Sequence, residues 1–220
     1  MLDQAIAMPV AKRRPGDTIS LLVGAYALLA IAAVAVIDAI WGLFVVADYS
    51  WISDTISDLA AGDSSRIVDF AIKGFSIAVG LVGLALWRWN LGRLTGHSWR
   101  YWVGCAIACA LAPVIYFIAG YDGYSGKPMG EMTIHLYLVY ALGLGFPLMA
   151  WLTEPAFEAV SRRWRNLSLG LAVIWVLTAP YFMFMGTGWD GLYERGLALM
   201  LLVWFGVAGW NLVRQGRGLL

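Results

Sequence analysis

The residues that could do chemistry lie at one end of long apolar segments. Ser57 and Asp58 follow the first of these segments, and His135 lies near the start of another. A carboxylate and an imidazole can exchange protons with a substrate, and a serine beside them can act as a nucleophile or a substrate contact. Arg195, next to Glu194, could hold an anionic head group through its planar set of N–H donors. These residue types predict acid–base chemistry on a polar, lipid-like molecule, or the binding of one.

His135 allows three interpretations. Glu131 precedes it by one helical turn, so the two side chains would share a face. Such a pair could hold a metal ion, with a third ligand drawn from Asp58, Asp122 or Glu194. It could also let the carboxylate orient a general base, or it could be a structural hydrogen bond. The sequence leaves the metal, the acid–base and the structural interpretation open.

Six long apolar stretches must position these residues. They run over residues 19–47, 66–90, 101–119, 132–152, 166–186 and 192–213. Each is close to or above the ~20 residues that an α-helix needs to cross ~30 Å of hydrocarbon. Charged residues make up only 13% of the 220-residue chain, whereas a soluble domain carries about 25%. We therefore predict an all-α, polytopic integral membrane protein: a six-transmembrane-helix bundle over 19–213, between short tails at 1–18 and 214–220.

The basic residues predict the orientation of this bundle. Lysine and arginine are frequent in both tails and in the second and fourth loops, at Lys12, Arg13, Arg14, Arg88, Arg93, Arg100, Arg162, Arg163, Arg165, Arg214 and Arg217. The other three loops are acidic or mixed. Under the positive-inside rule, this alternation predicts that both termini are cytoplasmic, in the plasma (bacterial inner) membrane. A net charge of +1 indicates no nucleic-acid partner, and the arginines are interpreted as topology anchors beside anionic lipid.

The first outer loop, residues 49–62, has the pattern of a short surface helix. Its apolar residues recur at helical spacing: Ile52, Ile56 and Leu59. Ser53 or Asp54 could cap such a helix. We therefore predict a short interfacial helix that holds Ser57 and Asp58 over the outer mouth of the bundle. Both are also ordinary cap and turn residues, so a structural role for them stays open.

Charged residues inside the predicted spans need partners, because an unpaired charge in hydrocarbon costs several kcal/mol. Asp69 and Lys73 are one turn apart and are predicted to neutralise each other. Asp38 could bond Lys73 or reach the outer head groups. The predicted topology places all of these at the outer side of the bundle, so we expect any polar pocket to open outward.

The stretch YSWISDTISDL, residues 49–59, resembles the hallmark of a family of bacterial and archaeal membrane proteins catalogued as domain of unknown function 998. In that family an aromatic residue and then I-S-x-[TL]-[IL]-S-[DE]-L-[GA] follow the first span; this chain has Ala60 where glycine is common. The region of His135 and the sequence GLYER, residues 191–195, are similar to later motifs of the family. The resemblance covers nearly the whole chain and implies a six-helix integral membrane protein with no established activity. The matching positions are Ser53, Thr55, Ser57, Asp58, His135, Glu194 and Arg195.

Three functions remain open at this point. The first is an intramembrane enzyme that acts on a lipid or lipid-like substrate, with Asp58 and His135 as the acid–base pair and Ser57 as the nucleophile. Its substrate-binding residues would be Arg195, Glu194, Ser53 and Thr55. The second is a non-catalytic binder or transporter of a lipid or small molecule in an outward-facing polar pocket, and the third is an assembly or scaffold subunit. The chain has no phosphate-binding glycine loop, HExxH or GxSxG motif, and it indicates no particular cofactor.

Overall fold

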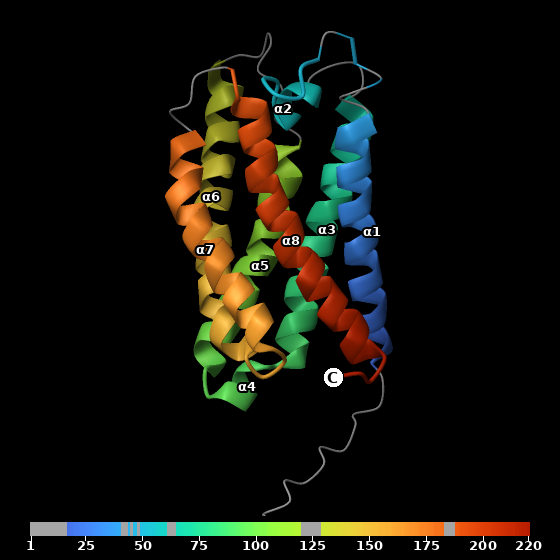
Figure 1. Cartoon of the computed structure of the whole chain (residues 1–220), viewed down its shortest axis with the longest axis vertical. Helices are drawn as coiled ribbons and strands as arrows, with labels where there is room; N and C mark the ends of the chain where they lie inside the picture. Colours follow the sequence, from blue (N-terminus) through green and yellow to red (C-terminus); the bar gives the residue numbers. More distant parts are fainter. Residues whose placement is uncertain are drawn as a thin grey trace, which may run out of the picture.

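Long helices arranged side by side form the protein (Figure 1). The computed structural model describes residues 17–40, 44, 46–47, 49–60, 65–119, 129–182 and 188–220, apart from the side chains of residues 129–133. The long helices are α1 (Thr18–Ile40), α3 (Ser65–Trp89), α5 (Ser98–Ile118), α6 (Met129–Phe157), α7 (Arg162–Phe182) and α8 (Asp190–Gly216). Two short helices are α2 (Ile56–Leu59) and α4 (Gly92–Thr95). These described residues include no strand, so the all-α prediction is confirmed.

Five of the long helices are long and apolar enough to cross a membrane. They are α1, α3, α5, the 134–157 part of α6, and α8. Within its described residues α7 does not reach the same hydropathy, because Arg162, Arg163 and Arg165 occupy its first turn. The apolar helices agree with a membrane protein, and the sixth span stays a prediction.

The helices pack in an order that brings the first and the last together. α1 packs against α3 and α8, α5 against α3 and α6, and α7 against α6. Gly24 allows the close approach of α1 to α8, since a Cβ atom at this position would lie 2.8 Å from the backbone nitrogen of Val213. Trp204 of α8 and Tyr101 of α5 are fully buried in the core between the helices. The contact between α1 and α8 positions the cluster described below.

The described chain begins and ends at the same end of the bundle (Figure 1). α1 starts there, α8 ends there, and α4 lies there as well, whereas α2 lies at the opposite end. Arg88, at the end of α3, donates to Asp17 at 3.1 Å. Arg165 of α7 donates to Glu154 of α6 at 3.0 Å. The described basic residues on which the orientation was predicted thus lie at the α4 end, and the polar loop that contains α2 lies at the opposite end.

The predicted loop helix is present but is shorter than expected. α2 is a single turn, and its N-cap is Thr55 rather than Ser53 or Asp54. The Thr55 side chain accepts a hydrogen bond from the backbone N–H of Asp58 at 3.1 Å, and Asp58 accepts one from the backbone N–H of Thr55 at 2.9 Å. This reciprocal pair is a capping box, which selects Thr55 as the start of the helix. The position of α2 at a membrane surface stays a prediction.

The embedded charges pair, although not all as expected. Lys73 lies 3.3 Å from Asp69, one turn earlier in α3, so this predicted ion pair is confirmed. The expectation that Asp38 bonds Lys73 or reaches the head groups is wrong. Asp38 pairs with Arg195 of α8 instead, because the packing of α1 against α8 brings these two side chains together.

Candidate functional site

Arg195 is the centre of the polar region at the α2 end. It lies in the second turn of α8 and is only 6% exposed. Its Nε donates to Oδ2 of Asp38 at 3.0 Å, and its Nη2 donates to Oδ1 of the same carboxylate at 2.9 Å. Two parallel bonds between a guanidinium and a carboxylate form the strongest type of side-chain ion pair. This pair joins α1 to α8, two helices at opposite ends of the sequence.

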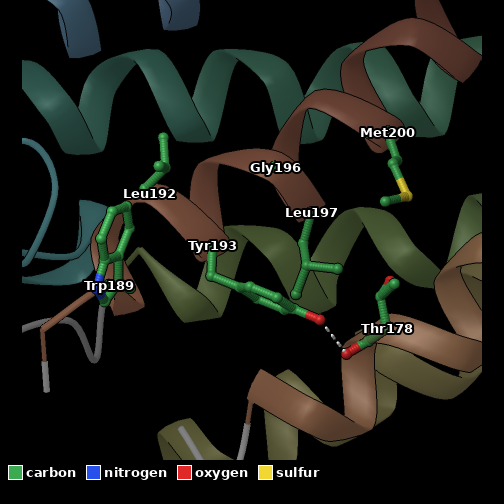
Figure 2. Close-up of a pocket in the computed structure, with 7 residues that line it drawn as sticks. All are labelled: Thr178, Trp189, Leu192, Tyr193, Gly196, Leu197 and Met200. Atoms are coloured by element: carbon green, nitrogen blue, oxygen red, sulfur yellow. Dashed lines mark hydrogen bonds between the residues drawn. The ribbon is translucent and has the colours of Figure 1, made fainter. Parts of the chain in front are cut away.

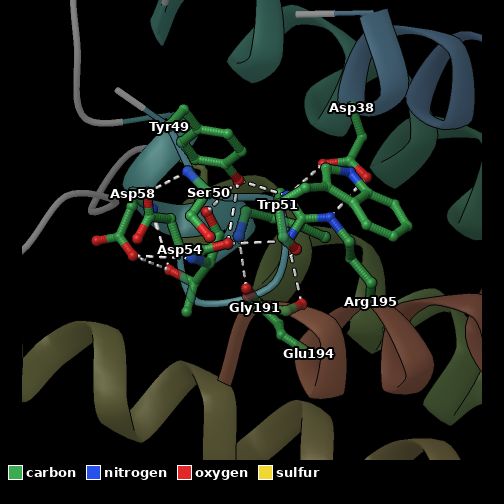
Figure 3. Close-up of polar contacts among 11 residues, drawn as sticks. Asp38, Tyr49, Ser50, Trp51, Asp54, Asp58, Gly191, Glu194 and Arg195 are labelled. Carbon is green, nitrogen blue, oxygen red and sulfur yellow. Dashed lines mark hydrogen bonds and ion pairs between the residues drawn. The ribbon is translucent and has the colours of Figure 1, made fainter. Parts of the chain in front are cut away.

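The rest of the Arg195 guanidinium holds the loop that follows α1. Nη1 donates to backbone carbonyls of Trp51 at 3.0 Å, Asp54 at 2.8 Å and Gly191 at 3.0 Å. Nη2 also donates to the Tyr49 hydroxyl, and the Trp51 ring lies 4.7 Å from the guanidinium carbon. Figure 3 shows these groups converging on Arg195. An arginine has five N–H donors, and each nitrogen here has an acceptor inside the protein.

We call this group of residues the Arg195 cluster. Its members are Arg195, Asp38, Tyr49, Trp51, Asp54 and Gly191. Gly191 is required by the close approach of two backbones, since a Cβ atom there would lie 2.7 Å from the carbonyl carbon of Asp54 and 2.9 Å from its nitrogen. Burial raises the pKa of Tyr49 to about 12, an effect that the neighbouring Arg195 only partly offsets. Tyr49 therefore stays a neutral hydrogen-bond donor and acceptor at ordinary pH.

Further hydrogen bonds fix the loop in this place. Tyr49 donates to the carbonyl of Thr55 at 2.8 Å. A carboxylate oxygen of Glu194 accepts the backbone N–H of Ile56 at 2.6 Å. The backbone N–H of Leu192 donates to the carbonyl of Ile52 at 2.9 Å. The first two turns of α8 thus hold residues 49–60 through backbone as well as side-chain groups.

The predicted substrate-binding residues are all engaged in holding the loop. Ser53 donates to Asp54 at 3.1 Å, and Thr55 caps α2. Glu194 and Arg195 contact the loop as described above. Binding of an anionic head group by Arg195 would have to break one of its internal hydrogen bonds. The structure brings these four residues together, and each of them forms hydrogen bonds with other groups of the protein.

The three predicted catalytic residues are not brought together by any hydrogen bond. Asp58 is exposed, and its carboxylate accepts hydrogen bonds from Thr55. Ser57, a residue of α2, is buried, and in the described part of the chain no hydrogen bond links its hydroxyl to an ionisable side chain. His135 is buried in α6, 5% exposed, and the hydrogen bonds of Arg195, Glu194 and Asp58 do not include it. A serine nucleophile needs a base within hydrogen-bond reach, and Ser57 lacks one in this arrangement.

The metal interpretation of His135 gains no support from the described residues. They contain no group of three or more His, Cys, Asp and Glu side chains placed to bind a metal ion. Asp122 and the side chain of Glu131, two of the candidate ligands, lie outside the described residues. The metal, acid–base and structural interpretations of Glu131 and His135 therefore all stay open.

Figure 2 shows a pocket beside α8. At 3.6 residues per turn, its lining residues lie on the face of α8 opposite Arg195 and Gly191. It is an open pocket of about 350 Å³ between α7 and α8. It is lined by Thr178, Trp189, Leu192, Tyr193, Gly196, Leu197 and Met200. The residues from α8 recur at intervals of three and four, which places them on one face of the helix. None of them was predicted as a site residue, and this apolar pocket is separate from the polar pocket that the sequence predicts, which stays a prediction.

Sequence reasoning also missed Asp38, Tyr49 and Trp51 as partners of Arg195. Asp38 lies 157 residues before Arg195, so only the tertiary contact of α1 with α8 reveals the pair. A signal was available for Tyr49, since it is the aromatic residue that opens the loop motif. The pocket had a signal too, namely the apolar and glycine spacing along one face of α8.

Comparison with known proteins places the chain in a family. No curated protein and no solved structure matches it. The family described as "Protein of unknown function (DUF998)" matches residues 28–211, which include most of α1, the whole loop motif and most of α8. The predicted resemblance is thereby confirmed, and the chain belongs to the DUF998 family.

Proposed function

We propose that this chain is a six-span protein of the plasma membrane that binds a lipid or lipid-like molecule from the outer leaflet without transforming it. The α2 end is then the outer end, and both termini are cytoplasmic. The apolar helices support the membrane location. The alternation of basic and acidic loops supports the orientation. The gathering of the described chain ends at the α4 end supports an even number of spans.

α7 is the sixth span in this proposal. Its 21 residues give a helix about 31 Å long, enough for the ~30 Å hydrocarbon core. Its arginines lie at the α4 end, where Arg165 is paired with Glu154 and Glu158. Paired arginines at the cytoplasmic interface do not prevent the rest of α7 from spanning the membrane.

The observation that carries the binding function is the pocket between α7 and α8. Its lining is apolar apart from Thr178, Tyr193 and the exposed Trp189, as expected for a site that takes a hydrophobic molecule. All lining residues belong to α7, to α8 or to the residue just before α8. The neighbouring helices α1 and α6 contribute none of them. A molecule dissolved in the outer leaflet could enter the pocket from the side.

The geometry favours binding over a reaction. The lining residues include no carboxylate, imidazole or thiol, the groups that most often transfer protons or attack a substrate. The ionisable groups at the α2 end are occupied in holding the loop. Among them, Asp58 caps α2 and lies outside the pocket lining.

Native mass spectrometry of the protein extracted in a mild detergent tests this function. Phosphatidylcholine is the added probe, and we expect a discrete adduct on the wild-type protein. Gly196→Phe should remove the adduct, because a side chain at Gly196 meets no atom within 4 Å and so grows into the pocket. Gly170→Phe is the matched control, since Gly170 of α7 also has open space but does not line the pocket.

Two results would overturn the proposal. The first is an adduct that survives Gly196→Phe as well as it survives Gly170→Phe. The second is a new lipid product, detected by its mass after incubation with a total lipid extract and absent from an Asp58→Asn variant. That product would replace the binding proposal with the enzyme hypothesis.

A further inference from the structure

We infer that the pocket between α7 and α8 takes one hydrocarbon chain of an outer-leaflet lipid and does not select the head group. The inference rests on the proposed function and deepens it by naming the part of the lipid that is recognised. Four observations carry it: the length of the pocket, its volume, the state of its polar groups, and the charge of its lining residues.

The length of the pocket matches one leaflet. Its lining runs along α8 from Trp189, just before the helix begins, to Met200. Eleven residues of α-helix rise about 16 Å, close to half of the ~30 Å hydrocarbon core. One turn beyond Met200 the two helices meet again, where Trp204 Nε1 donates to Ser168 Oγ at 2.8 Å. The pocket thus begins at the level of an interfacial tryptophan and stops near the middle of the membrane.

The volume of the pocket suits a single chain. This volume of about 350 Å³ is near the lower end of the roughly 300–1,000 Å³ of ligand pockets. A slender hydrocarbon chain therefore suits it better than a bulky ring system.

The polar groups inside the pocket are already satisfied. The Tyr193 hydroxyl donates to the carbonyl of Thr178 at 2.9 Å, as Figure 2 shows. The Thr178 hydroxyl donates to the carbonyl of Ile174 at 2.8 Å. A polar ligand group would find no free donor beside these residues, and its burial without a partner would be unfavourable. The interior therefore suits a part of a molecule that has no hydrogen-bonding groups.

Among the described residues that line the pocket, none is a cation that could hold an anionic head group. Trp189 is 62% exposed, and its indole N–H has no acceptor in the part of the chain that the structure describes. An indole at this level donates to phosphate or ester oxygens that all phospholipids share. The nearest arginine on α8 is Arg195, which lies on the opposite face and is saturated by the cluster. Head groups of different charge should therefore bind alike.

Photo-crosslinking tests the placement of the chain. Two phosphatidylcholine probes carry a diazirine on one acyl chain, either near the ester or at the chain end, and labelled peptides are mapped by mass spectrometry. We expect the first probe to label α8 near Trp189 and Leu192, and the second to label it near Leu197 and Met200. Gly196→Phe should abolish both patterns. Gly170→Phe adds the same side chain in open space outside the pocket and should preserve them, which separates filling of the pocket from any misfolding.

Competition between head groups tests the lack of selection. Phosphatidylglycerol and phosphatidylcholine with identical chains should displace the probe within about twofold of each other. A preference of about tenfold for the anionic lipid, about 1.4 kcal/mol, would overturn the inference. Equal labelling of all membrane-facing helices by both probes would overturn it as well, because such labelling indicates only the lipid that surrounds any membrane protein. If a lipid adduct forms but the labels map elsewhere, the inference alone fails; if no adduct forms, the proposed function fails with it.

Discussion

Removing Arg195 should detach the loop from the bundle. In Arg195→Met the aliphatic volume is largely kept, but both oxygens of Asp38 lose their partner. The carbonyls of Trp51, Asp54 and Gly191 lose a donor at the same time. The side chain of Asp38 is 15% exposed, so water can restore only part of what is lost. The variant therefore leaves a carboxylate uncompensated in a low-dielectric region.

The size of the effect follows from this loss. Breaking a buried ion pair by removing one partner typically costs about 3–5 kcal/mol. Asp38→Leu alone should cost a similar amount, because it leaves the guanidinium without its counter-charge. The double variant should lose less free energy of unfolding than the two single variants lose together, since neither charge is then left without a partner. We expect a coupling energy of about 2 kcal/mol, within the range found for residues in direct contact.

The assay is a double-mutant cycle on the free energy of unfolding in mixed micelles. A second reading reports on the loop itself, through a cysteine placed at Ser57 in a chain that carries Cys105→Ala and Cys109→Ala. Ser57 is 8% exposed, so a maleimide should label it slowly in the parent and quickly in Arg195→Met. This labelling separates detachment of the loop from general loss of stability.

The pair of Asp69 and Lys73 provides a matched control. It is a single contact of 3.3 Å, and its side chains are 23% and 32% exposed. Lys73→Met should therefore cost less, about 1 kcal/mol or below, and should leave the labelling of the cysteine at position 57 unchanged. A coupling energy between Asp38 and Arg195 within about 0.5 kcal/mol of zero, with slow labelling in Arg195→Met, would refute the reasoning.

Three further predictions concern the loop and the topology. Gly191→Ala should speed labelling of the cysteine at position 57, since the new Cβ atom would lie 2.7 Å from the carbonyl carbon of Asp54 in the loop. Gly196→Ala should leave this labelling unchanged, because a Cβ atom there has no atom within 4 Å. Cysteines introduced at Asp122 and Arg163 should label from opposite sides of sealed cells, and labelling of both from outside would exclude the proposed topology. The pKa of Tyr49 is raised from 10.0 to about 12, so its stabilising effect is complete below pH 10 and is lost as the pH rises toward 12. Tyr49→Phe should remove that step from the pH profile of labelling, and an unchanged step would show that another group titrates.

The sequence was a good guide to whatever depends on neighbouring residues. The apolar stretches became long helices because hydrophobic length and helix geometry are local properties. The ion pair of Asp69 with Lys73 was predictable for the same reason, since one helical turn separates them. The capping role of Asp58 was within reach too, because Thr55-x-x-Asp58 has the spacing of a capping box. The catalytic interpretation of Asp58 stays a prediction beside this capping role.

The sequence was a poor guide to contacts between distant segments. The pair of Asp38 with Arg195 depends on how α1 crosses α8, and that crossing depends on small residues such as Gly24. The pocket depends on how far α7 diverges from α8 above the contact of Ser168 with Trp204. No periodicity within one helix determines either geometry.

Ionisable residues at one depth suggested an outward-facing polar pocket, yet the same clustering has a simpler physical origin. In a medium of low dielectric, charged groups at the same level gain most by satisfying one another. Arg195 does so completely, with an acceptor on each of its nitrogens. Such a cluster leaves no N–H donor of Arg195 for a ligand. In the proposed function, the ligand therefore binds in the apolar pocket on the other face of α8.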